Sequence, residues 1–101
     1  YLSGRQSQSV AIARAIFQGE NLIIFDEPTA AMGIRESKAT NELIKSLPEK
    51  GFTVLVISHD MHQVFDIADR IYIMRNGEIM EDVLKSEITP IKLMERMSAD
   101  S

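Results

Sequence analysis

Ionisable side chains follow two short apolar runs of the sequence, and these side chains are of types that could bind phosphate groups and catalyse their reactions. Asp26 and Glu27 come directly after the run Leu22–Phe25, and His59 lies just beyond the run Val54–Ile57. Continuous apolar runs of this length are typical of strands buried on both faces, as in a parallel sheet. Ligands of such sheets bind beyond the carboxyl ends of the strands, so we expect these side chains to meet in one crevice.

The beginning of the chain carries an anion-binding signal. Ser3 and Gln6 have the spacing of a capping box, which predicts a helix that begins at Ser3 and continues to about Gln18, before Gly19. The free N–H groups and the positive dipole end of a helix start attract anions. Combined with two carboxylates and an imidazole, this helix start favours a phosphoanhydride bound together with a metal ion.

The elements that would position these groups form an α/β pattern. Between the two predicted strands, 22–25 and 53–57, the segment 36–47 has Ala39, Leu43 and Leu47 at steps of four, which predicts an amphipathic helix with these residues on its apolar face. A strand, a helix and a strand make a βαβ unit with parallel strands.

The second half of the chain predicts a short helix, a hairpin and a last helix. The short helix is expected over 61–68, and the strands 70–75 and 78–83 flank Asn76-Gly77, a strong signal for a type I′ turn. Thr89-Pro90 is typical of the N-cap and first turn of a helix that extends to about Met97.

Composition excludes several classes of protein. The 101 residues contain no cysteine, so disulfides and cysteine-ligated metals are excluded, and a cytoplasmic location fits. The apolar runs are too short to cross a bilayer, so a membrane role would need a partner. A net charge of −4 argues against nucleic acid as the main ligand.

The order of these motifs resembles the ATPase domain of ABC transporters. Leu2–Gln6, LSGRQ, resembles the family's LSGGQ signature, and Leu22–Pro28, LIIFDEP, resembles its Walker B strand with the following glutamate. Val56–Asp60 is similar to the switch-histidine segment, and Thr29–Ser37 is most similar to the branch that imports sugars such as ribose and fructose. The resemblance implies the C-terminal part of a P-loop NTPase-type domain over residues 1–87, with a parallel sheet, flanking helices and a β-hairpin, and a helical tail over 88–101.

The resemblance also implies roles for individual residues. Asp26 would hold a magnesium ion, Glu27 would orient or deprotonate the attacking water, and His59 would contact the γ-phosphate of ATP. The signature residues would bind the γ-phosphate of a nucleotide held by another subunit; they are Ser3, Gly4, Arg5 and Gln6.

The implied partners follow from the same family. Two such ATPase domains pair head to tail around two ATP molecules and drive transmembrane permease subunits. A periplasmic or extracellular sugar-binding protein would act with them indirectly. The expected location is the cytoplasm, peripheral at the inner face of the cell membrane.

The sequence departs from the family pattern at several places. Arg5 replaces the second signature glycine, while Ala30 and Gly33 replace a serine and an aspartate of the D-loop. No G-x-x-x-x-G-K-[ST] motif occurs in the 101 residues, so we expect this loop and the Q-loop glutamine upstream of Tyr1.

Two other interpretations remain open. One is a truncated, non-catalytic interaction module, which the missing phosphate loop favours for these residues alone. The other is a chromosome-maintenance or DNA-repair ATPase; those proteins lack a proline after the catalytic glutamate, whereas Pro28 stands here.

Arg5 generates the first prediction. In the family the signature approaches a phosphate closely, and we expect a long side chain there to obstruct closure of the dimer. Arg5→Gly in the complete subunit should therefore raise both the ATPase rate and the fraction of ATP-dependent dimer at equal protein concentration. A clear loss of both would instead identify the guanidinium as a phosphate ligand.

Overall fold

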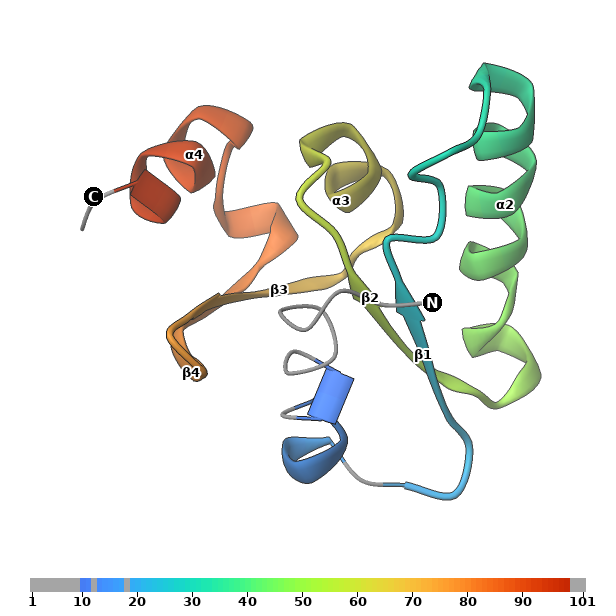
Figure 1. Cartoon of the computed structure of the whole chain (residues 1–101), viewed down its shortest axis with the longest axis horizontal. Coiled ribbons are helices and arrows are strands. Elements are labelled where there is room, and N and C mark those ends of the chain that lie inside the picture. Colours follow the sequence, from blue (N-terminus) through green and yellow to red (C-terminus); the bar gives the residue numbers. More distant parts are fainter. Residues whose placement is uncertain (1–9, 12, 18, 99–101) are drawn as a thin grey trace. The chain divides into compact units, whose positions relative to one another are not determined.

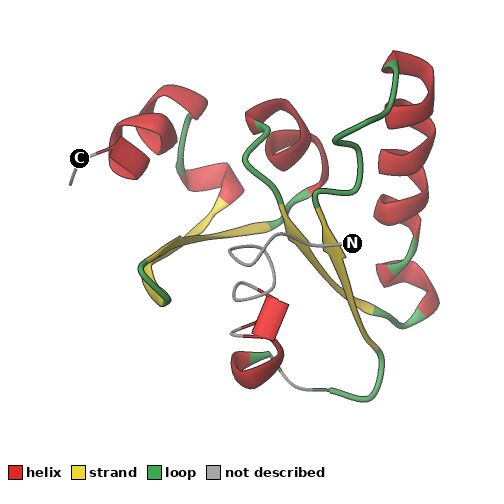
Figure 2. Cartoon of the chain, in the orientation of Figure 1, coloured by secondary structure: helices red, strands yellow, loops and turns green. Residues whose placement is uncertain are grey.

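The computed structural model describes residues 10–11, 13–17 and 19–98, which divide into two compact units (Figures 1 and 2). The first unit ends at His59 and the second begins at Asp60. The predicted helix start at Ser3 lies outside the described residues, whereas residues 10–11 and 13–16 are helical as expected. No helix in these ranges is long and apolar enough to cross a membrane.

The first unit contains two parallel strands joined through a helix. Strand β1 is Leu22–Asp26, helix α2 is Ile34–Ser46, and strand β2 is Thr53–Ile57. The strands pair from Leu22↔Thr53 to Asp26↔Ile57, which confirms the predicted parallel arrangement. Every residue of β1 is half-buried rather than fully buried, so the expectation of a strand buried on both faces is met only in part by the described residues.

Helix α2 turns a different face inward from the one predicted. Ile44 is only 3% exposed, whereas Leu43 is 55% exposed and Ala39 is also exposed. The prediction of a buried Ala39–Leu43–Leu47 stripe is therefore wrong, with only Leu47 partly buried. At 3.6 residues per turn a constant step of four drifts around the helix, and Leu43 projects about 100° away from Ile44. Residues that stay on one face of an α-helix recur at steps that alternate between three and four.

A short turn and a glycine follow the end of α2. A short 3-10 turn, Pro48–Lys50, follows the helix, and Gly51 has φ 92°, a left-handed conformation that glycine adopts without steric cost. The Phe52 N–H then donates to the Leu47 carbonyl at 3.3 Å, and the chain enters β2.

The second unit contains helix α3, a hairpin and helix α4. Helix α3 is Met61–Ile67, the hairpin strands are β3, Arg70–Arg75, and β4, Glu78–Leu84, and α4 is Pro90–Ser98. A second 3-10 turn, Lys85–Glu87, precedes α4. The predicted α/β fold class is confirmed, with a parallel pair in the first unit and an antiparallel hairpin in the second.

The hairpin turn has the backbone that its sequence predicts. Asn76 has φ 51° and Gly77 has φ 80°, and positive φ at both central positions is the mark of a type I′ turn. The pairing shifts register between Ile73 and Met74, where Ile73 opposes Glu81 and Met74 opposes Ile79. This bulge increases the local twist of the ribbon.

The core of the second unit forms between the hairpin and α4. Ile71, Ile73 and Leu93 are buried together, and α3 contributes Val64 and Phe65 to their surroundings. Thr89 accepts a hydrogen bond from the Lys92 N–H at 3.2 Å, so it caps α4 as predicted.

Side-chain hydrogen bonds also fasten the last turn of α4 to the hairpin. Arg75 Nη2 donates to the carbonyls of Arg96 and Met97 at 3.1 and 2.6 Å. Arg96 Nη1 in turn donates to Glu81 Oε1 at 3.1 Å. The domain boundary at residue 87 stays a prediction, although α4 shares its core with the preceding hairpin.

Asp60 generates the second prediction, because its side chain caps α3. Asp60 Oδ1 accepts from the N–H groups of His62 and Gln63 at 3.0 and 3.4 Å. Asp60→Ala should lower the free energy of unfolding by about 1 kcal/mol in urea denaturation, while Asp60→Asn, which keeps an acceptor oxygen, should cost much less. Equal losses in both variants would show that capping is not the reason for the effect.

Candidate functional site

The ends of β1 and β2 lie at the same edge of the parallel sheet. Asp26 is the last residue of β1 and pairs in register with Ile57, the last residue of β2. Glu27 therefore follows one strand where Ser58 and His59 follow the other. This is the arrangement that the sequence predicts for a ligand site beyond the carboxyl ends of parallel strands.

Glu27 continues the sheet by one hydrogen bond and then turns the chain. Its N–H donates to the Ile57 carbonyl at 2.8 Å, and its own carbonyl accepts from the Ala30 N–H at 3.2 Å. Its φ is 49°, in the left-handed region that costs a residue with a Cβ about 1 kcal/mol or more. Strain of this kind is found where the surrounding structure over-determines the backbone, as at functional sites.

Glu27 and His59 are in direct contact. His59 Nδ1 lies 2.6 Å from Glu27 Oε1, a short distance at which the ring N–H donates to the carboxylate. The Glu27 side chain is 16% exposed and the His59 side chain 84% exposed, so the imidazole stands on the solvent side of the pair. The contact fixes one carboxylate oxygen and leaves an imidazole open to a ligand arriving from solution.

Asp26 is the unsatisfied group of the site. Both of its carboxylate oxygens are buried and have no hydrogen-bond partner among the residues that the structure describes. Burial raises the pKa of Asp26 above its usual value, and the neighbouring charge of Glu27 raises it further. A buried carboxylate without partners is costly unless a cation or a donor accompanies it.

The described residues would supply few of the ligands of a metal ion at this site. Among the residues that the structure describes, no group of three or more His, Cys, Asp and Glu side chains could hold a metal ion. Asp26, with both oxygens unpartnered among the described residues, is the candidate ligand, and the remaining positions would be left to water or to a ligand. Magnesium in phosphate sites is bound in this way.

The other predicted site residues are not placed in this cluster. Ser3, Gly4, Arg5 and Gln6 lie outside the described residues. His62, the other histidine of the chain, is exposed on α3, and its backbone N–H donates to the Asp60 side chain. What sequence reasoning missed is the direct bond between His59 and Glu27; its only signal is the shared strand edge.

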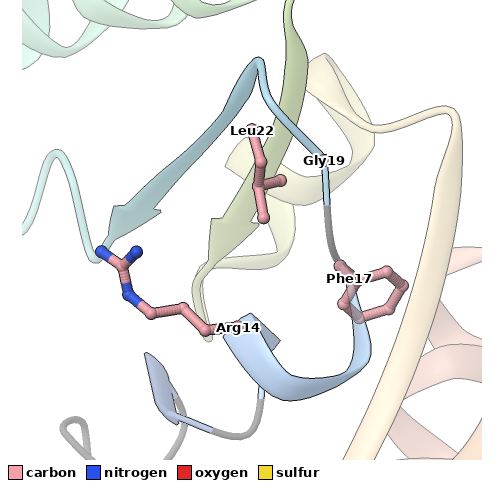
Figure 3. Close-up of a pocket in the computed structure, with 4 residues that line it drawn as sticks. All are labelled: Arg14, Phe17, Gly19 and Leu22. Carbon is pink, nitrogen blue, oxygen red and sulfur yellow. The ribbon is translucent and has the colours of Figure 1, made fainter.

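A pocket in the first unit is separate from this cluster. It has a volume of about 250 Å³ and is lined by Arg14, Phe17, Gly19 and Leu22, with the Leu22 side chain pointing into it (Figure 3). Leu22 begins β1 whereas Asp26 ends it, so the pocket does not include the carboxylates. It offers one guanidinium and no acid–base pair for chemistry.

The chain is similar in sequence to ATP-binding proteins of transporters, although no family model matches it. It is 40% identical over 98 residues to the xylose/arabinose import ATP-binding protein XylG of Sulfolobus acidocaldarius, covering 97% of this chain and 39% of that protein. It is 50% identical over 76 residues to the fructose import ATP-binding protein FrcA of Rhizobium meliloti, covering 75% and 29%. It is also 43% identical over 98 residues to the macrolide export ATP-binding/permease protein MacB of Pasteurella multocida, covering 88% and 15%.

The solved structures that resemble this chain are also ATP-binding proteins. MJ1267, an ATP-binding cassette of an ABC transporter, matches with a TM-score of 0.63 and 29% identity over 97% of this chain and 39% of that one. The ATP-binding cassette MJ0796, in a dimeric post-hydrolysis state bound to ADP and Pi, matches with a TM-score of 0.59 and 35% identity over 83% and 36%. The chain thus spans about two fifths of the length of these relatives or less.

Asp26 generates the third prediction. Its pKa is raised on folding, so the folded state binds a proton more tightly than the unfolded chain, and ionised Asp26 opposes folding. Stability should therefore fall as pH rises from the unfolded pKa of 3.8 through the raised folded pKa, and stay low above it. Asp26→Asn should remove this decline and stabilise the protein at pH 7 in urea denaturation without divalent metal.

The exposed carboxylate of Glu49 provides a matched control for this experiment, since it lies in the same unit. Glu49→Gln, which removes an exposed carboxylate, should leave the free energy of unfolding at pH 7 unchanged. If Asp26→Asn were less stable than the wild type at pH 7, the carboxylate would have a favourable partner in the protein.

Proposed function

We infer that this chain forms part of an ABC-type ATP-binding protein, and from that premise we propose that the protein hydrolyses ATP to drive transport through a membrane permease. The observation that carries the proposal is the cluster at the ends of β1 and β2: Glu27 bonded to His59 at 2.6 Å, beside the buried, unpartnered Asp26. The relatives of this chain are ABC ATPases, which supports ATP hydrolysis as its reaction.

Glu27 serves as the general base. A water molecule attacks the γ-phosphorus of ATP, a new P–O bond forms, and the bond from the γ-phosphorus to the bridging oxygen breaks to release ADP. The Glu27 carboxylate accepts the proton that the water loses. Its strained backbone and its bond to His59 hold the carboxylate in one orientation, which lowers the entropy cost of the reaction.

His59 acts from the exposed side of the pair. One ring nitrogen, Nδ1, bonds to Glu27, so the opposite nitrogen, Nε2, is the one left to face a γ-phosphate oxygen. Nε2 donates to that oxygen in the imidazolium form, in which both ring nitrogens carry a proton. The same imidazole can thus contact the phosphate and orient the base, which couples the presence of the γ-phosphate to the position of Glu27.

Asp26 fits a magnesium ion, because both of its oxygens are buried and lack partners within the described part of the chain. When bound, magnesium would neutralise charge on the phosphates. Asp26 would hold it through one carboxylate, with water and phosphate oxygens as the other ligands. Ser3, Gly4, Arg5 and Gln6 would face the γ-phosphate of a nucleotide held by a second ATPase domain, and a dimeric neighbour of known structure supports this pairing.

The proposed cargo is carbohydrate, moving inward. The xylose/arabinose and fructose import proteins and several ribose import proteins are among the relatives, and a macrolide exporter is the alternative they present. The resemblance of Thr29–Ser37 to the sugar-importing branch favours import. The subunit would then lie at the cytoplasmic face of the membrane, against its permease, with a sugar-binding protein outside.

Glu27→Gln in the complete subunit tests the proposal. The amide keeps the shape of the side chain but cannot accept a proton, so ATP binding should persist while kcat falls by about 10²–10⁴-fold. Steady-state ATPase assays and nucleotide titration measure the two effects separately. Glu36→Gln, which alters an exposed carboxylate in the first turn of α2, is the matched control.

The same variant separates import from export. Cells that carry Glu27→Gln should lose uptake of the transported pentose or hexose and keep their macrolide resistance. Retention of half the ATPase activity would remove Glu27 from the role of base, and loss of macrolide resistance with normal sugar uptake would replace import by export.

A further inference from the structure

The segment that joins Glu27 to α2 is held with little help from burial. Residues 30–33 are all exposed, with Met32 at 41%, and Ile34, the first residue of α2, is 90% exposed. Figure 1 shows this stretch running beside the first turns of α2. Because apolar burial contributes little here, specific hydrogen bonds must fix its conformation.

Two consecutive turns define the path of the segment. The Ala30 N–H donates to the Glu27 carbonyl at 3.2 Å, and the Met32 N–H donates to the Thr29 carbonyl at 3.1 Å. The first turn therefore begins on the backbone of Glu27 itself, whose φ is 49°. Any shift of the segment would change the backbone angles that aim the Glu27 carboxylate.

A side-chain bond ties the second turn to α2. Thr40 Oγ1 donates to Met32 Sδ at 3.3 Å, across eight residues of sequence. Thr40 is partly buried and lies one turn before Ile44, which anchors the inner face of α2 at 3% exposure. The hydroxyl is thus held by a packed helix, whereas the thioether belongs to the exposed segment.

We propose that Thr40 and Met32 form a clamp that positions Glu27 for hydrolysis, a role that rests on the function proposed above. The bond from Thr40 to Met32 restrains the second turn against α2. Through the two turns it also restrains the left-handed backbone of Glu27. Both residues act through Glu27 and are positioning residues. Glu27 is thereby held from two sides, by His59 at its carboxylate and by the clamp at its backbone.

Enzyme kinetics on the complete subunit test the clamp. Thr40→Val keeps the shape and removes the donor, and Met32→Leu keeps an apolar side chain and removes the sulfur. A bond to sulfur is weak, so each variant should lower kcat only about three-fold, with KM for ATP unchanged. The double variant should be no slower than either single one, because both changes break the same contact.

Two further variants separate positioning from general damage to α2. Thr40→Ser keeps a hydroxyl and should recover most of the wild-type kcat. Ser46→Ala removes another hydroxyl bond of α2, the one from Ser46 Oγ to the Leu43 carbonyl at 2.6 Å, and should leave kcat unchanged. A three-fold loss in Ser46→Ala as well would overturn the clamp in favour of a general effect on the helix.

Hydrogen exchange gives a readout independent of catalysis. Backbone amides of Ala30 and Met32 should exchange faster in Thr40→Val and Met32→Leu than in the wild type. Unchanged exchange together with unchanged kcat overturns the clamp. If the wild type has no ATPase activity, the proposed function fails, and faster exchange in the two variants still supports the clamp while unchanged exchange overturns it.

Discussion

The register of the two parallel strands is the constraint on which the candidate site depends. Asp26 pairs with Ile57, and the next N–H along, that of Glu27, donates to the Ile57 carbonyl at 2.8 Å. Successive residues of a strand point to opposite faces, so a slip of one residue would send Glu27 and His59 to different sides of the sheet. Their 2.6 Å contact exists because the strands end together.

The same edge holds groups that work against stability. Asp26 has two buried oxygens without partners among the described residues, and its pKa is raised by that burial and by Glu27. Glu27 itself has a left-handed backbone. Local costs of this kind persist where the rest of the structure compensates for them. The compensation here comes from the paired apolar strands and from the inner face of α2 around Ile44.

Within the second unit, polar side chains fix the ends of helices that are too short to be stable alone. Asp60 caps the start of α3, and Lys85 Nζ donates to the Phe65 carbonyl in its last turn at 3.2 Å. Arg75 does the same for the last turn of α4. Helices of this length gain most of their stability from such tertiary contacts rather than from propensity. His59 immediately precedes the Asp60 cap in sequence, so capping and candidate chemistry are adjacent along the chain.

The sequence alone determined the elements whose signals are local. Strand β2 has the predicted bounds, the turn at Asn76-Gly77 has the predicted positive φ angles, and Thr89 caps α4, because each depends on residues a few positions apart. Tertiary structure decided which face of α2 is buried: Ile44 instead of Leu43, since the sheet selects the inner face. It also decided that His59 bonds to Glu27 and that Thr40 bonds to Met32. These contacts join residues distant in the chain, and only the strand register and the helix rotation bring them within reach.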